Sequence, residues 1–151
     1  MLDKQFETWI EEVLLETRKE LHMETAIVSY IQDNDYTIVA VNSEMEGVFA
    51  VNQVFPLQDT YCRAVFESQQ SVRYDHVATI DGMLQHPVYQ AVKLESYIAA
   101  PIKNSEGKVV GTLNFTSLLP HKPKFTDAQQ VMVDNLATEL SLHIDKLKPS
   151  A

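Results

Sequence analysis

The sequence predicts an α+β fold in which helices at both ends of the chain cover one face of an antiparallel sheet. Near each end, apolar residues recur at spacings of three and four, which indicates amphipathic helices. Between the ends, pairs of β-branched and aromatic runs are separated by short polar turns, which indicates antiparallel hairpins. Strands grouped between terminal helices are typical of an α+β architecture.

The N-terminal third is expected to form a helix and a hairpin. The helix is predicted over residues 3–22, where an apolar stripe alternates with Glu and Lys. The runs "TAIVSYIQ" (25–32) and "YTIVAVN" (36–42) are predicted strands, joined by the polar turn "DNDY". A looser stretch, 43–56, follows and ends at a proline.

The middle of the chain is expected to be irregular. A short helix is predicted over residues 61–69, with Asp59 or Thr60 as its cap. A short strand is expected within 70–77, and residues 78–94 read as a long excursion with one helical turn. Such excursions inside a small domain are more often functional than idle.

The C-terminal third contains the clearest hairpin and the second long helix. Residues 96–104 and 109–118 are predicted strands around the turn "SEG". The final helix is expected over 126–148, opened by a capping box between Thr126 and Gln129.

Composition narrows the class of protein. The 151 residues suit a single domain, and the formal charge of −9, without a basic run, argues against nucleic acid and membrane surfaces as partners. No apolar stretch approaches the roughly 18 residues of a membrane span, and the acidic N-terminus is unlike a signal peptide. One cysteine makes neither an internal disulfide nor a cysteine zinc site. These features predict a cytoplasmic protein.

Several motifs in order resemble a GAF domain. They are "FPLQDTYCRAVFES", "HPVYQ", "LESYIAAPI", "GKVVGTLNFTS" and "FTDAQQVMVDNLATEL", within about residues 20–142. The chain is most similar to the sensory GAF modules that precede bacterial sensor kinases and diguanylate cyclases. The resemblance implies a PAS-like sheet with a small-molecule pocket on one face, and terminal helices that pair into a homodimer and carry a signal onward.

No output domain is expected within the chain, because only "KPSA" follows Leu147. The sequence therefore predicts either a free-standing sensor that acts on a partner, such as a sensor kinase or cyclase, or a piece of a larger protein. It does not separate the two.

The specialised activities of the resembled family are disfavoured by missing residues. Members that reduce free methionine sulfoxide use several cysteines, whereas this chain has Cys62 alone. Bilin-binding members attach the pigment through a cysteine beside a histidine, and the corresponding stretch offers His86 without a cysteine. Cyclic-nucleotide members carry Asp-Glu after a Phe, where this chain has Phe125 followed by Gln129 and Gln130. Other members of the resembled family bind nucleotides without this motif, so a nucleotide ligand stays open. The ligand is unassigned, and the protein is expected not to be an enzyme.

Cys62 is expected to be part of a pocket wall. It would share a helix face with Val65 and Phe66, and a buried cysteine behaves as a small apolar side chain. Two alternatives stay open: a reactive thiol, and a small anion held by backbone N–H groups at the start of the short helix, which Asp59 would oppose.

A metal site is disfavoured. Asp75, His76, Asp81 and His86 lie in the excursion without the spacing of a helical zinc motif. The remaining histidines are expected at the surface. They are His22, His121 and His143.

The last hairpin predicts where a ligand would bind. Strand alternation places small, aromatic and polar residues on one face and aliphatic residues on the other. The polar face of the second strand carries Thr112, Asn114 and Thr116. The predicted ligand-binding residues are Asp59, Tyr61, Cys62, Tyr74, His76, His86, Tyr89, Tyr97, Ala99, Asn114 and Thr116.

Two other functions stay open from the sequence: an interaction module whose pocket is empty, and an enzyme that uses Cys62. The apolar stripe of the first helix is wider than one sheet face requires, which predicts a surplus for a dimer seam. Its residues are Phe6, Ile10, Leu14, Leu15 and Leu21.

Overall fold

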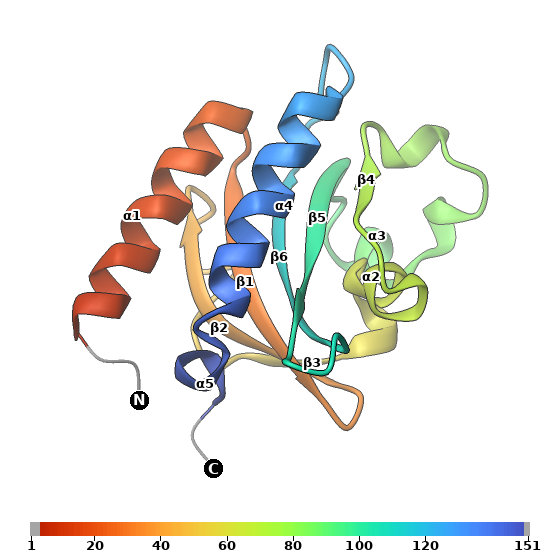
Figure 1. Ribbon diagram of the computed structural model, residues 1–151. Helices are drawn as coiled ribbons and strands as arrows, with labels where there is room; N and C mark the ends of the chain where they lie inside the picture. Colours follow the sequence, from red (N-terminus) through yellow and green to blue (C-terminus); the bar gives the residue numbers. More distant parts are fainter. Residues whose placement is uncertain (1–3, 150–151) are drawn as a thin grey trace.

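The computed structural model describes residues 4–149, which form one six-stranded antiparallel sheet with helices on both faces (Figure 1). The strand order is β3-β2-β1-β6-β5-β4. The strands are β1 (Thr25–Gln32), β2 (Asp35–Ser43), β3 (Val54–Pro56), β4 (Val72–Tyr74), β5 (Ser96–Lys103) and β6 (Val109–Ser117). The helices are α1 (Lys4–Leu21), α2 (Cys62–Ser68), α3 (Pro87–Ala91), α4 (Asp127–Ser141) and α5 (Ile144–Leu147). This confirms the predicted fold class.

Helices α1 and α4 cover the same face of the sheet, as predicted (Figure 1). Their apolar stripes pack with the inward side chains of β1, β5 and β6 into one buried cluster. From the sheet, Val28, Ile98, Leu113 and Phe115 are fully covered. The capping box at the start of α4 is present: Thr126 Oγ1 accepts a hydrogen bond from the Gln129 backbone N–H at 3.1 Å. The side chain of Gln129 returns the contact to Thr126 N at 2.8 Å.

Most of the apolar stripe of α1 is buried within this layer, which leaves little of it for the predicted dimer seam. Phe6, Ile10, Leu14 and Leu21 are all buried against the sheet and α4. Leu15 is half-buried. A helix that also packs beside a second helix buries a wider stripe than one that covers a sheet alone, and this is why α1 is apolar over so much of its surface.

The predicted final helix is interrupted, which corrects the expectation of one helix over 126–148. Helix α4 ends at Ser141, whose hydroxyl donates back to Ala137 O at 2.8 Å. The ring of His143 then packs against Phe6 and Trp9, with centroid distances of 5.2 and 5.8 Å. The break turns this ring toward α1, so His143 is half-buried rather than at the surface.

The other face of the sheet lies beneath α2, α3 and residues 75–94. The alternation predicted for the last hairpin is confirmed by the register, in which Tyr97 pairs with Thr116, Ala99 with Asn114, and Pro101 with Thr112. Tyr36 and Ile38 of β2 and Ile27 of β1 share this face. It is therefore covered by short, irregular segments, which leave space between them and the strands.

No helix within residues 4–149 combines the length and apolar character that crossing a membrane requires.

Candidate functional site beneath α2 and α3

A cavity of ≈ 250 Å³ lies between the strands and the segment that contains α2 and α3. Its floor comes from β1, β2, β5 and β6, and its walls come from residues 59–62 and 87–94. Apolar and aromatic side chains make up most of the lining, with a few polar groups at the floor. The lining residues are Ile27, Tyr36, Ile38, Phe49, Phe55, Asp59, Thr60, Tyr61, Cys62, Pro87, Val88, Ala91, Val92, Leu94, Tyr97, Asn114 and Thr116. This composition is typical of small-molecule sites.

Helix α2 brings Cys62 to the cavity without the predicted cap. Tyr61 occupies the N-cap position and makes no side-chain cap hydrogen bond. Neither Asp59 nor Thr60 caps the helix, because residues Leu57–Asp59 form a 3-10 turn in which the Thr60 hydroxyl donates to Leu57 O at 2.8 Å. The turn continues almost directly into α2. As a result Asp59 stands exposed at the cavity rim and Cys62 faces the sheet.

The Cys62 thiol is the centre of a buried polar network on the cavity floor. It accepts hydrogen bonds from the Tyr97 hydroxyl at 3.0 Å and from Asn114 Nδ2 at 3.3 Å. It shares a further hydrogen bond with Thr112 Oγ1 at 3.2 Å. Asn114 Nδ2 also donates to Tyr36 Oη at 3.0 Å. Every one of these side chains is buried, so the network fixes the floor in one arrangement.

Burial raises the pKa of the Cys62 thiol above its ordinary value, against the smaller opposite effect of its hydrogen bonds to Thr112, Tyr97 and Tyr36. Burial likewise raises the pKa of the Tyr36 and Tyr97 hydroxyls well above theirs. The neighbours of the thiol are hydroxyls and an amide, none of which acts as a base at neutral pH. Cys62 is therefore a protonated thiol in a polar floor, not an activated nucleophile.

Two polar atoms of the floor are left without partners. The hydroxyl of Thr116 is buried and makes no hydrogen bond with any described residue, although Thr116 lines the cavity. Asn114 is 2% exposed, and its amide nitrogen makes all of its side-chain hydrogen bonds to the described residues. Its carboxamide oxygen therefore accepts none. Since buried polar groups in folded proteins are almost always hydrogen-bonded, the Thr116 hydroxyl marks where a ligand group would bind, and the Asn114 oxygen two residues away is free to accept a second hydrogen bond.

Tyr61 organises the aromatic wall. Its hydroxyl donates to Leu94 O at 2.9 Å, which ties α2 to the segment before β5. Its ring makes edge contacts with Tyr74, His86 and Tyr97, at centroid distances of 5.8, 4.8 and 5.4 Å. The cluster holds the start of α2 and the start of α3 against the sheet.

His86 caps α3 through its ring. Nδ1 accepts a hydrogen bond from the Val88 backbone N–H at 3.2 Å, so the proton of the neutral ring lies on Nε2. Burial, and then the charge of Arg63, lower the pKa of His86 below its ordinary value. The ring is accordingly uncharged at neutral pH, in the form that the cap requires.

The Glu95 carboxylate lies outside the cavity lining and holds the segment 76–95 together. Its carboxylate accepts hydrogen bonds from the Tyr89 hydroxyl at 2.8 Å and from the Ala78 backbone N–H at 2.9 Å. His76 Nε2 lies 3.8 Å from the same carboxylate. Three parts of the segment 76–95 thus meet at one side chain.

Comparison with known proteins now identifies the family. The family model described as "GAF domain" matches residues 4–145, nearly the whole chain. The chain belongs to the GAF domain family. A search of curated proteins finds no match.

Solved structures show the same fold at low identity. The GAF domain region of a putative membrane protein from Geobacter sulfurreducens PCA is 15% identical, with a TM-score of 0.73 and 93% of each chain covered. The cyanobacteriochrome receptor PixJ is 17% identical, with a TM-score of 0.73 over 94% of this chain and 96% of that one. A type II free methionine-R-sulfoxide reductase from Thermoplasma acidophilum is 15% identical, with a TM-score of 0.71 over 95% and 96%.

The predicted ligand-binding residues of this GAF domain fall into two groups. Those that line the cavity are Asp59, Tyr61, Cys62, Tyr97, Asn114 and Thr116. Those that do not are Tyr74, His76, His86, Tyr89 and Ala99. Tyr74 and His86 support Tyr61, and His76 and Tyr89 bind Glu95. Tyr74, His76, His86 and Tyr89 thus hold the segment in place from behind the cavity wall.

Several lining residues of the GAF domain were missed by the sequence prediction. Tyr36 and Ile38 had a usable signal, because alternation along β2 places them on the face of Ile27. Phe49 and Phe55 had none, since they lie in or beside the loose stretch before α2. Within residues 4–149, no group of three His, Cys, Asp or Glu side chains gathers closely enough to hold a metal ion.

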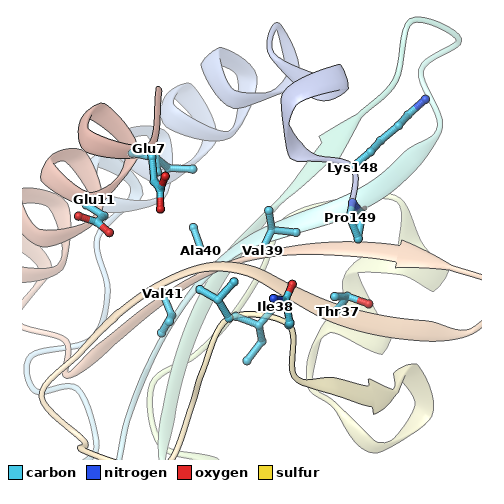
Figure 2. A pocket seen from close by; sticks show the side chains of 12 residues that line it. Glu7, Glu11, Thr37, Ile38, Val39, Ala40, Val41, Lys148 and Pro149 are labelled. Carbon is cyan, nitrogen blue, oxygen red and sulfur yellow. The ribbon is translucent and has the colours of Figure 1, made fainter. Parts of the chain in front are cut away.

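A second cavity of the GAF domain, of ≈ 340 Å³, lies between α1, β2 and the segment after α5 (Figure 2). Glu7 and Glu11 reach it from α1, and Lys148 comes from the C-terminal segment. All three charged side chains are exposed, and none of its lining atoms is a buried polar group without a partner. It is a gap beside the first half of α1 with no sign of a specific ligand.

Proposed function

We propose that this protein is a non-catalytic sensory GAF domain that binds a small molecule in the cavity beneath α2 and α3 and signals through its terminal helices. One observation carries the proposal: the buried Thr116 hydroxyl lines an apolar cavity and has no partner among the described residues. Leaving such a group unpaired costs stability that a ligand hydrogen bond would restore.

The state of Cys62 supports a role without catalysis. The structurally similar methionine-R-sulfoxide reductase is an enzyme. In this chain, however, the only cysteine is a buried thiol whose pKa is raised. It lacks both a second thiol and an adjacent base. A nucleophile of this kind needs one or the other.

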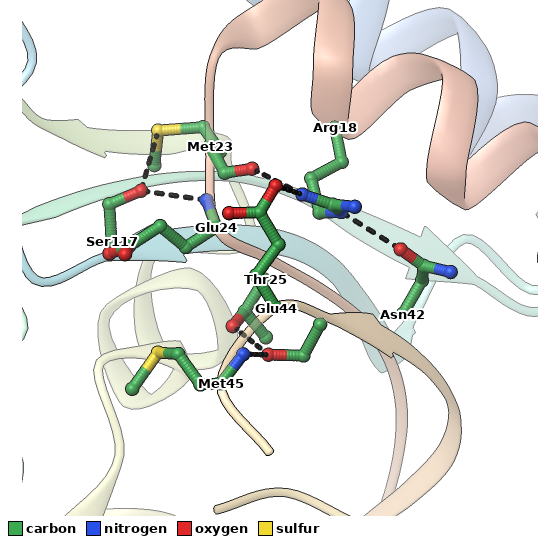
Figure 3. Close-up of polar contacts among 9 residues, drawn as sticks. Arg18, Met23, Glu24, Thr25, Asn42, Glu44, Met45 and Ser117 are labelled. Carbon is green, nitrogen blue, oxygen red and sulfur yellow. Dashed lines mark hydrogen bonds and ion pairs between the residues drawn. The ribbon is translucent and has the colours of Figure 1, made fainter.

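A route from the cavity to α1 runs along the end of β6. Thr116 faces the cavity, and its neighbour Ser117 faces the other side of the sheet. The Ser117 hydroxyl accepts a hydrogen bond from Glu24 N at 2.9 Å and contacts Met23 Sδ at 3.5 Å (Figure 3). The carbonyl of Met23 in turn accepts from the buried guanidinium of Arg18, near the end of α1. We infer that a ligand at Thr116 biases the position of α1 through these contacts.

The outer face of α4 supports a protein partner, and we propose a second copy of the chain. Val131 is 52% exposed and Leu142, directly after the helix, is 79% exposed. They lie about three turns apart on one side of the helix. An isologous contact between two such faces would give a two-fold dimer. Light scattering across concentrations tests this: Leu142→Glu should shift the protein toward the monomer, and an already monomeric wild type would contradict it.

A thermal-shift screen tests the sensory proposal. The compounds should include nucleotides, cyclic nucleotides, amino acids, organic acids, haem and neutral aromatic molecules. A ligand at ~100 times its dissociation constant adds about 2.7 kcal/mol, which moves the midpoint of a domain this size by about 5–10 °C. A reproducible, saturable shift is expected. A flat screen would contradict the proposal and favour an interaction module.

A pair of variants locates the binding site. Ala91 is exposed on α3 and lines the cavity, so Ala91→Trp should fill it and abolish the shift. Gln90→Trp places the same side chain one residue away, outside the lining, and should retain the shift. A shift that survives Ala91→Trp would place binding elsewhere and contradict the proposal.

A further inference from the structure

The charge of the cavity excludes one class of ligand. Among the described lining residues, Asp59 alone carries a charge at neutral pH, and no Lys, Arg or His lines the cavity. A ligand anion would lose its hydration without gaining a counter-charge, and it would enter past the Asp59 carboxylate. Burying an unpaired charge is costly, so a carboxylate or phosphate ligand is strongly disfavoured.

The cations and amides near the entrance do not change this result. Arg63 is exposed, and its Nε lies 3.4 Å from the Glu67 carboxylate. His86 is held neutral by burial and accepts a hydrogen bond through Nδ1. At the start of α2, the N–H groups of Arg63 and Ala64 already donate to backbone carbonyls. At these positions an anion would compete with Glu67 for the Arg63 guanidinium and would find the two amides already paired.

The unpaired polar atoms of the cavity floor determine which hydrogen-bonding groups the ligand needs. The Tyr97 hydroxyl and Asn114 Nδ2 donate within the floor network. The Asn114 carboxamide oxygen is left as an acceptor, and the Thr116 hydroxyl is left as an acceptor or donor. They lie two residues apart on one face of β6, about 7 Å along the strand. A ligand that satisfies this edge needs at least one N–H or O–H donor.

The shape of the cavity favours a flat ring. Aromatic residues line it from the floor, the walls and the rim: Tyr36, Phe49, Phe55, Tyr61 and Tyr97. The volume of ≈ 250 Å³ corresponds to about eight water molecules at ~30 Å³ each, which is room for one or two fused rings. A cyclic nucleotide carries a charged phosphate, which this lining would leave without a counter-charge.

We propose that the ligand is an uncharged aromatic or heteroaromatic molecule of one or two rings that donates a hydrogen bond to the Asn114–Thr116 edge of β6. This inference rests on the proposed function, because it assigns the ligand class of the same cavity. It excludes organic acids, phosphates and nucleotides as ligands there.

Three matched probes test the ligand class by isothermal titration calorimetry. Indole is neutral and has one N–H donor, 1-methylindole lacks the donor, and indole-2-carboxylate adds a negative charge. Indole should bind with one-to-one stoichiometry, and each of the other two should bind at least about tenfold more weakly, because each loses the hydrogen bond or buries a charge. Equal or tighter binding of either analogue overturns the inference. So does the absence of indole binding at millimolar concentration.

The variants Ala91→Trp and Gln90→Trp distinguish a failure of the proposed ligand class from a failure of the proposed sensory function. Indole binding should be lost in Ala91→Trp and retained in Gln90→Trp. If the screen instead finds an anion whose stabilisation is lost in Ala91→Trp and kept in Gln90→Trp, the ligand class is wrong and the sensory function stands. If no compound of any class binds in the cavity, both proposals fail.

Discussion

Thr112 and Thr116 lie on the same face of β6, both buried, yet only Thr112 has hydrogen-bond partners for its hydroxyl. Thr112 Oγ1 shares a hydrogen bond with Ser29 Oγ at 2.7 Å and receives one from Asn114 Nδ2 at 3.1 Å. Thr116 Oγ1 has none among the described residues. The hydroxyl groups on this face of β6 are therefore hydrogen-bonded at Thr112, within the buried network, and unpaired at Thr116, which lines the cavity.

Replacing each threonine by valine should separate these two roles. Thr112→Val leaves Ser29, Cys62 and Asn114 short of a partner and should lower the free energy of unfolding by about 1–3 kcal/mol. Thr116→Val removes an unpaired hydroxyl without changing volume and should be neutral or stabilise by up to about 1 kcal/mol. Urea unfolding measures both. A cost for Thr116→Val equal to that of Thr112→Val would show that the Thr116 hydroxyl is satisfied in the unliganded protein.

Substitutions of Cys62 should reveal its role as a hydrogen-bond acceptor. Cys62→Ala removes the acceptor of the Tyr97 hydroxyl and should cost about 2–3 kcal/mol in unfolding free energy. Cys62→Ser keeps an acceptor and should cost less. In the wild type, a thiol reagent at neutral pH should label Cys62 slowly and in a denaturant-dependent way. Rapid native labelling would contradict the assignment and support an enzyme.

The protein should lose stability at alkaline pH in two stages. Burial raises the pKa of Cys62, Tyr36 and Tyr97 in the folded state, so the folded protein holds these protons more tightly than the unfolded chain. Their stabilisation is complete below the unfolded values and decreases above them, by about 1.4 kcal/mol per pH unit for each group. The decrease should begin near the unfolded thiol value of about 8.5 and steepen near the tyrosine value of about 10.

Cys62→Ser is the control for this alkaline transition. It removes the thiol step, so its stability should stay level until about pH 10, where the tyrosines begin to titrate. Chemical unfolding at a series of pH values from neutral upward measures this. An identical onset in Cys62→Ser and wild type would contradict the role given to the thiol.

The cap of α3 should loosen in acid. The neutral ring of His86 accepts a hydrogen bond from Val88 N, and its folded pKa is lowered. A lowered pKa of a base gives stability that is present above the unfolded value of about 6.5 and is lost as the pH falls through the folded value. The Val88 amide resonance should therefore move as the pH falls below the ordinary histidine value of about 6.5 and through the lowered pKa of His86. His86→Asn caps without titrating, and an equal shift in that variant would count against the histidine.

The buried guanidinium of Arg18 should matter more than its partner Glu44. Arg18 donates to Glu44 Oε1 at 2.8 Å, Asn42 Oδ1 at 2.8 Å and Met23 O at 3.2 Å. Arg18→Met leaves Asn42 and Met23 unpaired and should cost about 2–4 kcal/mol in unfolding free energy. Glu44 is 63% exposed, so Glu44→Ala should cost under about 1 kcal/mol. The exposed Lys19→Met is the control on the same helix, and a comparable cost there would contradict this account.

The sheet could be predicted well from the sequence because the patterns that indicate strands involve residues close together in the chain. Alternation along residues 96–104 and 109–118 sorts side chains to two faces, and the register pairs Tyr97 with Thr116 as that alternation requires. The capping box of Thr126 and Gln129 also depends on residues three apart. Such features need no knowledge of distant contacts.

The errors of the sequence prediction have a common physical cause, which is tertiary contact. The predicted cap of α2 is wrong because the Thr60 hydroxyl donates a hydrogen bond to Leu57 O in the preceding 3-10 turn. Helix α4 breaks where His143 packs against α1. His121 was expected at the surface but stacks on Phe125 at 4.0 Å and contacts Leu21 O through Nε2. In each case the side chain contacts a residue that cannot be predicted from the residues next to it in the sequence.

Tertiary contacts also limited the prediction of the residues that line the cavity. Polar residues at 59–62 and 114–116 were predicted to converge, and the fold brings them together. His76 and Tyr89 were predicted at the ligand, but Glu95 holds them outside the lining. Sequence alone does not distinguish a residue that lines a wall from one that supports the wall from behind.

Ligand binding beneath α2 and α3 is tested most directly by an amide chemical-shift titration of ¹⁵N-labelled protein with the most stabilising compound of the thermal-shift screen. We expect saturable shifts concentrated at Cys62, Val88, Asn114 and Thr116, which surround the cavity beneath α2 and α3. Shifts concentrated instead at Glu11, Val39 and Lys148, around the cavity beside α1, would contradict it.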